Sequence, residues 1–152
     1  MSMFGALDIS ASGLSAERMR MDVTAENLAN AQTTRTAAGG PYRRKDVVLQ
    51  TAGSDGFSAA LTAAAGNVPG APAGQQPGGV QVTGIVEDQT APRRIYDPGH
   101  PDADAQGYVS MPNVNPVTEM VDLISASRAY EANVTAMTTA KQMFTKTFDI
   151  LR

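Results

Sequence analysis

The segment Asp102-Ala-Asp-Ala-Gln-Gly107 is the strongest candidate for metal chemistry, because it follows the first half of an EF-hand calcium loop. Alternating oxygen ligands of this kind surround Ca²⁺, and the glycine allows the sharp turn. The second half is missing, since position twelve is Asn113 instead of glutamate and Pro112 interrupts the helix that should follow. We interpret the segment as a polar turn, with a calcium-binding module as the lesser alternative, and expect no metal and no cofactor.

The single histidine, His100, lies between Pro98-Gly99 and Pro101, close to Asp97, Asp102 and Asp104. Zinc or general-base chemistry would need a second basic or soft ligand, and the chain has no cysteine. Two prolines and a glycine favour a rigid turn, with a weak metal site as the alternative. No nucleophile elbow, phosphate loop or dinucleotide fingerprint occurs. We therefore expect no catalytic residues and no enzyme.

Basic residues form two short clusters, at 43–45 and 93–94, in a chain with a net charge of −3. The clusters have no interleaved aromatic platform, so nucleic-acid binding is not expected. We interpret them as solvated strand ends or as charge contacts between subunits.

The composition is poor for a compact domain of 152 residues, with 5% aromatic residues, no tryptophan, 14 glycines and 9 prolines. No stretch of 18 apolar residues occurs, and the first residues have no basic region followed by an apolar run. We expect a soluble chain that is not an integral membrane protein and has no cleaved signal peptide.

Two terminal segments have heptad patterns typical of long helices that pair with others. In the first, a helix from about residue 4 to 31, Leu7, Leu14, Met21 and Leu28 recur every seven residues. These four residues form either an assembly seam or a plain intramolecular core. The second segment continues the pattern with Met120, Leu123, Tyr130, Val134, Met137, Phe144, Phe148 and Leu151.

The second helix is predicted to start at Asn115-Pro116, where asparagine caps the helix and proline occupies its first position, with Glu119 near the positive end of the dipole. About 36 helical residues would extend over roughly 54 Å, longer than a small domain is wide. A further apolar stripe, Val117, Val121 and Ile124, widens its face. Part of this helix must therefore contact another chain.

Between the helices, strands are predicted at 42–50, 80–87, 93–96 and 108–111, and a flexible Gly/Pro loop at 63–79. The expected fold is mainly α with a small β region, in which two long terminal helices form an elongated helical hairpin or coiled coil. The expected organisation is an N-terminal axial helix at 1–34, a middle β-containing region at 35–112 and a C-terminal axial helix at 113–152.

The stretches 12–30, 115–133 and 146–151 resemble the terminal signatures of the bacterial flagellar rod and hook proteins. The central stretches 39–45 and 96–108 resemble the proximal-rod members of that family. The residues that carry the terminal motifs are Asn27, Asn30, Asn115, Pro116, Glu119, Arg128, Tyr130 and Asn133.

This resemblance implies a structural subunit of the flagellar basal-body rod that polymerises through its terminal helices into a helical tube, transmits torque and conducts exported subunits. It implies export through the flagellar type III apparatus and a location in the basal body, where the rod crosses the periplasm. The implied partners are copies of the same chain, neighbouring rod proteins, the rod-base adaptor or MS-ring region and the export apparatus. The alternatives are another rod component of similar length and a coiled-coil adaptor that does not polymerise.

Overall fold

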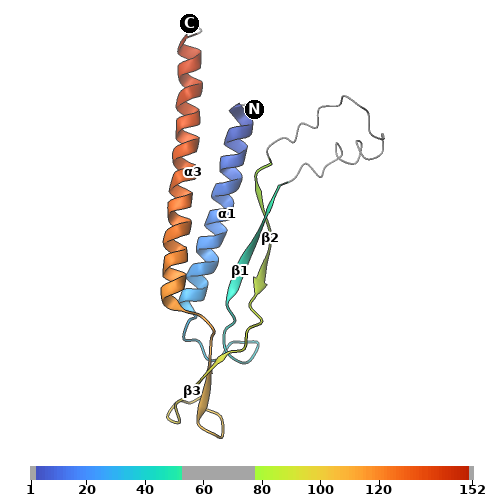
Figure 1. The fold of residues 1–152 in the computed structure, drawn as a ribbon, viewed down its shortest axis with the longest axis vertical. Helices are drawn as coiled ribbons and strands as arrows, with labels where there is room; N and C mark the ends of the chain where they lie inside the picture. The colour runs from blue at the N-terminus through green and yellow to red at the C-terminus, as the bar shows by residue number, and fades with distance from the viewer. Residues whose placement is uncertain (1–2, 53–77, 151–152) are drawn as a thin grey trace, which may run out of the picture. The chain divides into compact units, whose positions relative to one another are not determined.

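The computed structural model describes residues 3–52 and 78–150. Two long helices are separated in sequence by four short strands (Figure 1). The elements are α1 (Met3–Ala29), β1 (Lys45–Thr51), β2 (Val80–Glu87), β3 (Arg93–Tyr96), β4 (Tyr108–Met111) and α3 (Pro116–Ile150). The predicted class, mainly α with a small β region, is confirmed. The Gly/Pro loop predicted at 63–79 lies outside the described residues except for positions 78 and 79.

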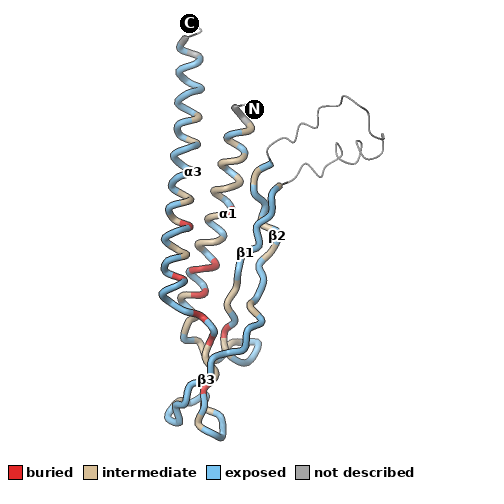
Figure 2. Tube along the Cα trace, in the orientation of Figure 1, coloured by how far each residue is buried: buried red, intermediate tan, exposed pale blue. Residues whose placement is uncertain are grey.

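The chain divides into two compact units. The first comprises Met1–Glu17, Leu49–Thr83 and Ala129–Arg152, and the second comprises Arg18–Val48 and Gly84–Arg128. Within the described residues, Ala16 is the one buried residue of the first unit, whereas the second unit contains all the others (Figure 2). The second unit therefore holds the core, small as it is.

Side-chain caps fix the ends of both helices. The Asn30 side-chain amide donates to the Glu26 carbonyl at 2.9 Å, just beyond the end of α1. At the start of α3, Asn115 Oδ1 accepts from the Val117 amide at 3.1 Å, and Pro116 is the first helical residue. The predicted start of the second helix is thus confirmed, because the capping signal is local in sequence.

The strands form two separate two-stranded sheets, β1 with β2 and β3 with β4. The pair β3–β4 is antiparallel, with Arg93 opposite Met111 and Tyr96 opposite Tyr108. The ranges predicted for β2, β3 and β4 agree with the structure. The first predicted strand begins three residues too early, because Tyr42 donates its backbone N–H to Thr33 in the turn that follows α1.

Glycines shape the turns where the backbone enters the left-handed region. Gly39 and Gly40 have φ of 86° and 78°, in a turn closed by the bond from Thr36 N to Gly40 O. No helix among residues 3–52 and 78–150 combines the length and the apolar character that crossing a membrane requires.

Candidate assembly interface

The most buried apolar residues of α1 and α3 are small or medium-sized. In the second unit, Val23 is 5% exposed and Ala126 is fully buried. In the first unit, Ala16 is 2% exposed, and a Cβ placed on Gly13 would lie 3.1 Å from the Asn133 side-chain amide. Small side chains let two helices approach closely, as Gly13 of α1 does beside Asn133 of α3 in the first unit.

Large apolar residues of α3 face solvent instead. Val117 is 64% exposed, Val121 59%, Ile124 55% and Met120 45%. A helix in water normally buries residues of this size against its own chain, and an exposed cluster of them marks a contact surface. In the second unit, α3 therefore carries an exposed surface of large apolar side chains.

The structure places the twelve predicted assembly residues in three environments. Half-buried positions are Leu7, Leu14, Met21, Leu28, Leu123, Tyr130 and Met137. Exposed positions are Met120, Val134 and Phe144. The side chains of Phe148 and Leu151 lie outside the described residues. None of the ten described residues is fully buried, so each of them retains exposed surface.

A buried polar cluster in the second unit joins α1, β1 and α3, and its centre is Asn27, which is 1% exposed. The Asn27 side-chain amide donates to Lys45 O at 2.8 Å and to Glu119 Oε2 at 3.1 Å. Its oxygen accepts from the Lys45 N–H at 2.9 Å and from the Tyr42 hydroxyl at 3.0 Å. One side chain thus satisfies polar groups of three elements, which fixes where β1 leaves α1.

Glu119 is 1% exposed and is paired with Arg44, whose Nε lies 2.6 Å from Glu119 Oε1. Arg44 also approaches Asp122 at 3.7 Å. Its hydrogen bond to Glu119 raises the pKa of the Arg44 guanidinium, which stays charged. Interpreting Arg44 as a solvated strand end was therefore wrong, because a buried carboxylate needs a cation.

The other basic residues of the first cluster do lie near the surface. Lys45 Nζ lies 2.6 Å from Glu26 Oε1, and Arg43 donates to Gln89 at 3.0 Å. Tyr42, between this surface and Asn27, is 8% exposed. Burial raises the pKa of the Tyr42 phenol above its usual value, and the negative charge of the Glu26 carboxylate is the second-largest cause of this increase. The hydroxyl therefore keeps its proton and remains a donor to Asn27.

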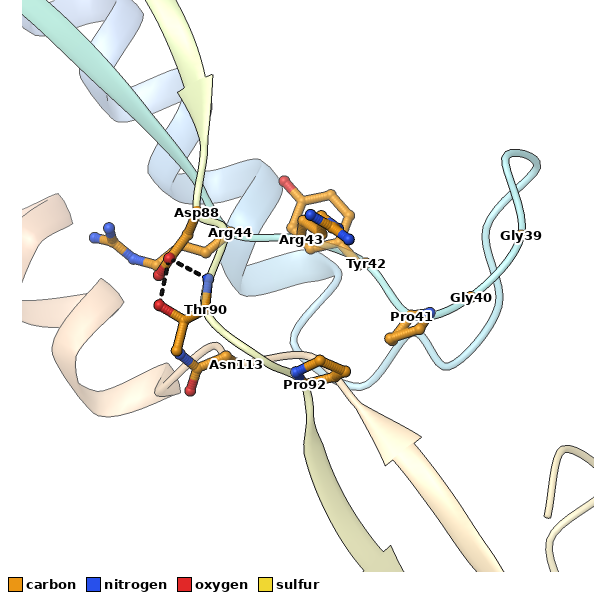
Figure 3. A pocket seen from close by; sticks show the side chains of 10 residues that line it. All are labelled: Gly39, Gly40, Pro41, Tyr42, Arg43, Arg44, Asp88, Thr90, Pro92 and Asn113. Carbon is orange, nitrogen blue, oxygen red and sulfur yellow. Dashed lines mark hydrogen bonds between the residues drawn. The ribbon is translucent and has the colours of Figure 1, made fainter. Parts of the chain in front are cut away.

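An open cavity of about 140 Å³ lies beside this cluster in the second unit (Figure 3). Its lining includes Tyr42, Arg43, Arg44, Asp88 and Thr90. The one carboxylate of the lining, Asp88, accepts from both the hydroxyl and the N–H of Thr90. These bonds lower the pKa of Asp88 and close a turn, so this carboxylate is engaged in structure.

The segment that resembles a calcium loop is a polar turn at the end of the β3–β4 sheet. Asp104 Oδ1 accepts from the N–H groups of Gln106 and Tyr108, both at 2.9 Å, and its other oxygen is 2.6 Å from Arg94. The single histidine, His100, accepts from the Asp102 N–H at 3.1 Å. Within the part of the chain that the structure describes, no group of three or more possible metal ligands occurs.

Two family models match the chain at its ends. The model described as "Flagella basal body rod protein" matches residues 7–35, and the model "Flagellar basal body rod FlgEFG protein C-terminal" matches residues 105–150. Curated relatives match it throughout. The flagellar basal-body rod protein FlgC of Bacillus subtilis is 47% identical, with 99% of both chains covered. The chain belongs to the flagellar basal-body rod protein family.

More distant members agree with this assignment. FlgC of Salmonella typhimurium is 42% identical over 99% of this chain and 98% of its own. FlgC of Aquifex aeolicus is 40% identical over 98% and 97%. The resemblance to the rod and hook proteins, and to their proximal-rod members in particular, is thereby confirmed.

The motif residues of this rod protein have identifiable structural places. Asn27 and Glu119 are bonded to each other in the buried cluster, Asn30 and Asn115 cap helix ends, and Pro116 begins α3. Asn133 lies against Gly13, Tyr130 is half-buried and Arg128 is exposed. Arg44, Tyr42 and Asp122 complete the cluster, and no pattern in the sequence assigned them to it. The available signal was Glu119 itself, an acidic residue beside the predicted apolar residue Met120 in the first turn of α3.

Proposed function

We propose that this chain is a structural, non-catalytic subunit of the flagellar basal-body rod, in its proximal part. It polymerises through α1 and α3 into a helical tube that transmits torque and conducts exported subunits. The observation that carries this proposal is the exposure of Val117, Val121 and Ile124 on α3, all above 50%. Association buries these residues, and each buried apolar side chain contributes about 1.5–3 kcal/mol.

In the assembled rod, the terminal segments 1–34 and 113–152 form the axial helical hairpin or coiled coil, and the region 35–112 lies outside it. Contacts between two different faces of a subunit do not close on themselves, and they build a helix of subunits. The buried cluster around Asn27 and Glu119 supports this role, because it holds the first turn of α3 against the end of α1. The outward face of α3 is then preformed before assembly.

The proposed partners are copies of this chain, neighbouring rod proteins, the rod-base adaptor or MS-ring region and the type III export apparatus. The proposed location is the basal body, where the rod crosses the periplasm, reached by export without cleavage of a signal peptide. A monomer with a small core suits this route, because little stability opposes its transport in an unfolded state.

The test is complementation of a Bacillus subtilis strain that lacks its own FlgC. Expression of this chain should restore motility and basal bodies with complete rods under the electron microscope. Rods that remain absent, while the chain is produced and exported, would contradict the proposal. If rods remain absent and the purified protein instead binds a partner helix without polymerising, the non-polymerising adaptor would be favoured.

Substitutions test whether the helices carry the assembly. Val134→Asp, at an exposed position of α3, should abolish complementation because a charge would be buried in the subunit contact. Leu123→Asp should do the same. Ala105→Asp, in the exposed turn between β3 and β4, is the matched control and should remain motile. Circular dichroism of each purified variant separates loss of assembly from loss of folding.

A further inference from the structure

One face of α3 in the second unit combines apolar residues with a single charge. Val117, Val121, Ile124 and Arg128 follow one another at spacings of four, three and four residues, so they lie on the same side of the helix. All four are exposed. We refer to these residues as the α3 stripe.

An exposed stripe of a different kind lies on α1 in the same unit. Arg18, Asp22, Ala25 and Ala29 have the same spacing and are all exposed. They lie away from the buried seam residues Val23 and Asn27. This α1 stripe presents small methyl groups at one end and two opposite charges at the other, so large side chains fit against its alanine end.

The charges of the two stripes are available for a partner. Asp22 and Arg128 form no ion pair with any residue in the ranges 3–52 and 78–150. Arg128 comes four residues after Ile124, and Asp22 comes three residues before Ala25, so each charge lies about one helical turn from the small or apolar part of its stripe. The two stripes are therefore complementary both in side-chain size and in charge.

We propose that the α3 stripe of one copy packs antiparallel against the α1 stripe of a second copy. In this contact Arg128 pairs with Asp22, Ile124 lies over Ala25 and Val121 lies over Ala29. The inference rests on the proposed function and names the surfaces through which it operates.

The charges also select this register. A shift of one helical turn would place Arg128 of one copy opposite Arg18 of the other, which is unfavourable for like charges. Each copy offers both stripes, on different helices. The contact is therefore heterologous, and it can repeat from copy to copy.

The absence of native cysteines makes disulfide cross-linking a direct test. Full-length protein carrying Val121→Cys is mixed with full-length protein carrying Ala29→Cys under mild oxidation with copper phenanthroline. We expect the mixed disulfide dimer to form at least about tenfold faster than with Ala105→Cys, an exposed control in the β3–β4 turn. Equal rates with the two partners would overturn the proposal.

Charge reversal tests the ion pair within the same assay. Arg128→Asp in the Val121→Cys protein, or Asp22→Arg in the Ala29→Cys protein, should each slow the cross-link several-fold. Combining both reversed proteins should restore the rate, a result that a general loss of structure would not give. A combined pair as slow as the single reversals would contradict the pairing of Arg128 with Asp22.

Complementation separates this inference from the proposed function. If the chain restores rods while Val121→Cys and Ala29→Cys copies fail to cross-link, both in solution and in isolated basal bodies, the stripe contact is wrong and the rod function stands. A cross-link in basal bodies to a different rod protein, with none between copies, would overturn the second copy as the partner. Cross-linking without restored rods would instead contradict the rod function.

Discussion

The Asn27 side-chain amide lies 3.1 Å from Glu119 Oε2, so the last turn of α1 and the first turn of α3 share a buried hydrogen bond. The two residues are 92 positions apart in sequence. Both are 1% exposed, and Asn27 also bonds the backbone of Lys45. In a unit with few large buried residues, this contact determines where the strands depart from the helix pair.

Replacing Asn27 with alanine should destabilise the second unit strongly. The change leaves the Tyr42 hydroxyl, the Lys45 peptide groups and Glu119 Oε2 without this partner in a buried site. We expect the free energy of unfolding to fall by about 2–4 kcal/mol, measured by urea denaturation with circular dichroism. The control is Asn30→Ala, whose amide bonds an exposed carbonyl in its own helix and should cost about 1 kcal/mol. Similar losses for the two variants would contradict a special role for Asn27.

Replacing Arg44 alone should lower the free energy of unfolding more than removing the charges of both Arg44 and Glu119. Arg44→Met leaves the Glu119 carboxylate buried without its cation, and we expect a loss of about 3–5 kcal/mol in unfolding free energy. The double variant Arg44→Met with Glu119→Gln should recover part of that loss, because the buried charge is then absent. Arg43→Met, at an exposed neighbour, is the control and should change the stability by less than about 0.5 kcal/mol. Additive effects in the double variant would show that the two side chains are not coupled.

Stability should decline at alkaline pH in a manner that depends on Tyr42. Because burial raises the pKa of the Tyr42 phenol, the folded state holds the proton more tightly than the unfolded state. This contribution is fully present below the unfolded pKa of about 10 and is lost as the pH rises through the higher folded value. Tyr42→Phe should therefore lower stability at pH 7, by loss of the bond to Asn27, and flatten the decline above pH 10.

Urea denaturation at pH 8, 10 and 11 measures this difference, and tyrosinate absorbance reports the titration directly. The chain has four tyrosines. The Tyr42→Phe variant should lack the component whose pKa is raised above the ordinary tyrosine value. Identical alkaline profiles for the two proteins would contradict a raised pKa at Tyr42.

Local signals in the sequence were sufficient for the helix ends and for most strands. Asn115 and Pro116 begin α3 through a cap that involves only neighbouring residues, and the alternation of Val80 to Glu87 matches β2. The pairing of Arg44 with Glu119 joins residues 75 positions apart, and nothing near either residue specifies the other. Long-range polar contacts of this kind need the folded arrangement to become visible.

The heptad pattern identified apolar residues but not which face of each helix the chain itself buries. It selects Met120 and Val134 on α3, both of which are exposed, whereas the buried side chains of the described part of α3 are Glu119 and Ala126. On α1 it selects Met21 and Leu28, which are half-buried beside Val23. Hydrophobic periodicity weighs large side chains most, whereas the buried apolar positions of the described helices are the smaller residues Ala16, Val23 and Ala126.

Gly107 should tolerate no side chain at the end of the β3–β4 sheet. Its φ of 80° is strained for other residues, and a Cβ would lie 2.9 Å from the Tyr96 ring. Gly107→Ala should destabilise the β3–β4 sheet by about 1–2 kcal/mol and shift the amide resonances of β3 and β4. Gly99→Ala is the matched control, since its nearest contact would be an ordinary 3.6 Å to Asp97. Equal spectral changes in both variants would rule out a specific constraint at Gly107.

Amide exchange should vary steeply along α3 in the free monomer. The sequence patterns predict little protection over residues 5–30 and 120–150 before assembly, and the structure refines this expectation. Ala126 is fully buried near the Glu119 cluster, whereas residues 141–147 are all exposed. We expect the amides near residue 126 to exchange at least about tenfold more slowly than those of 141–147. Opening the helix near residue 126 must disrupt the buried polar cluster around Glu119. Asn27→Ala should remove most of this difference, and uniform protection along α3 would contradict it.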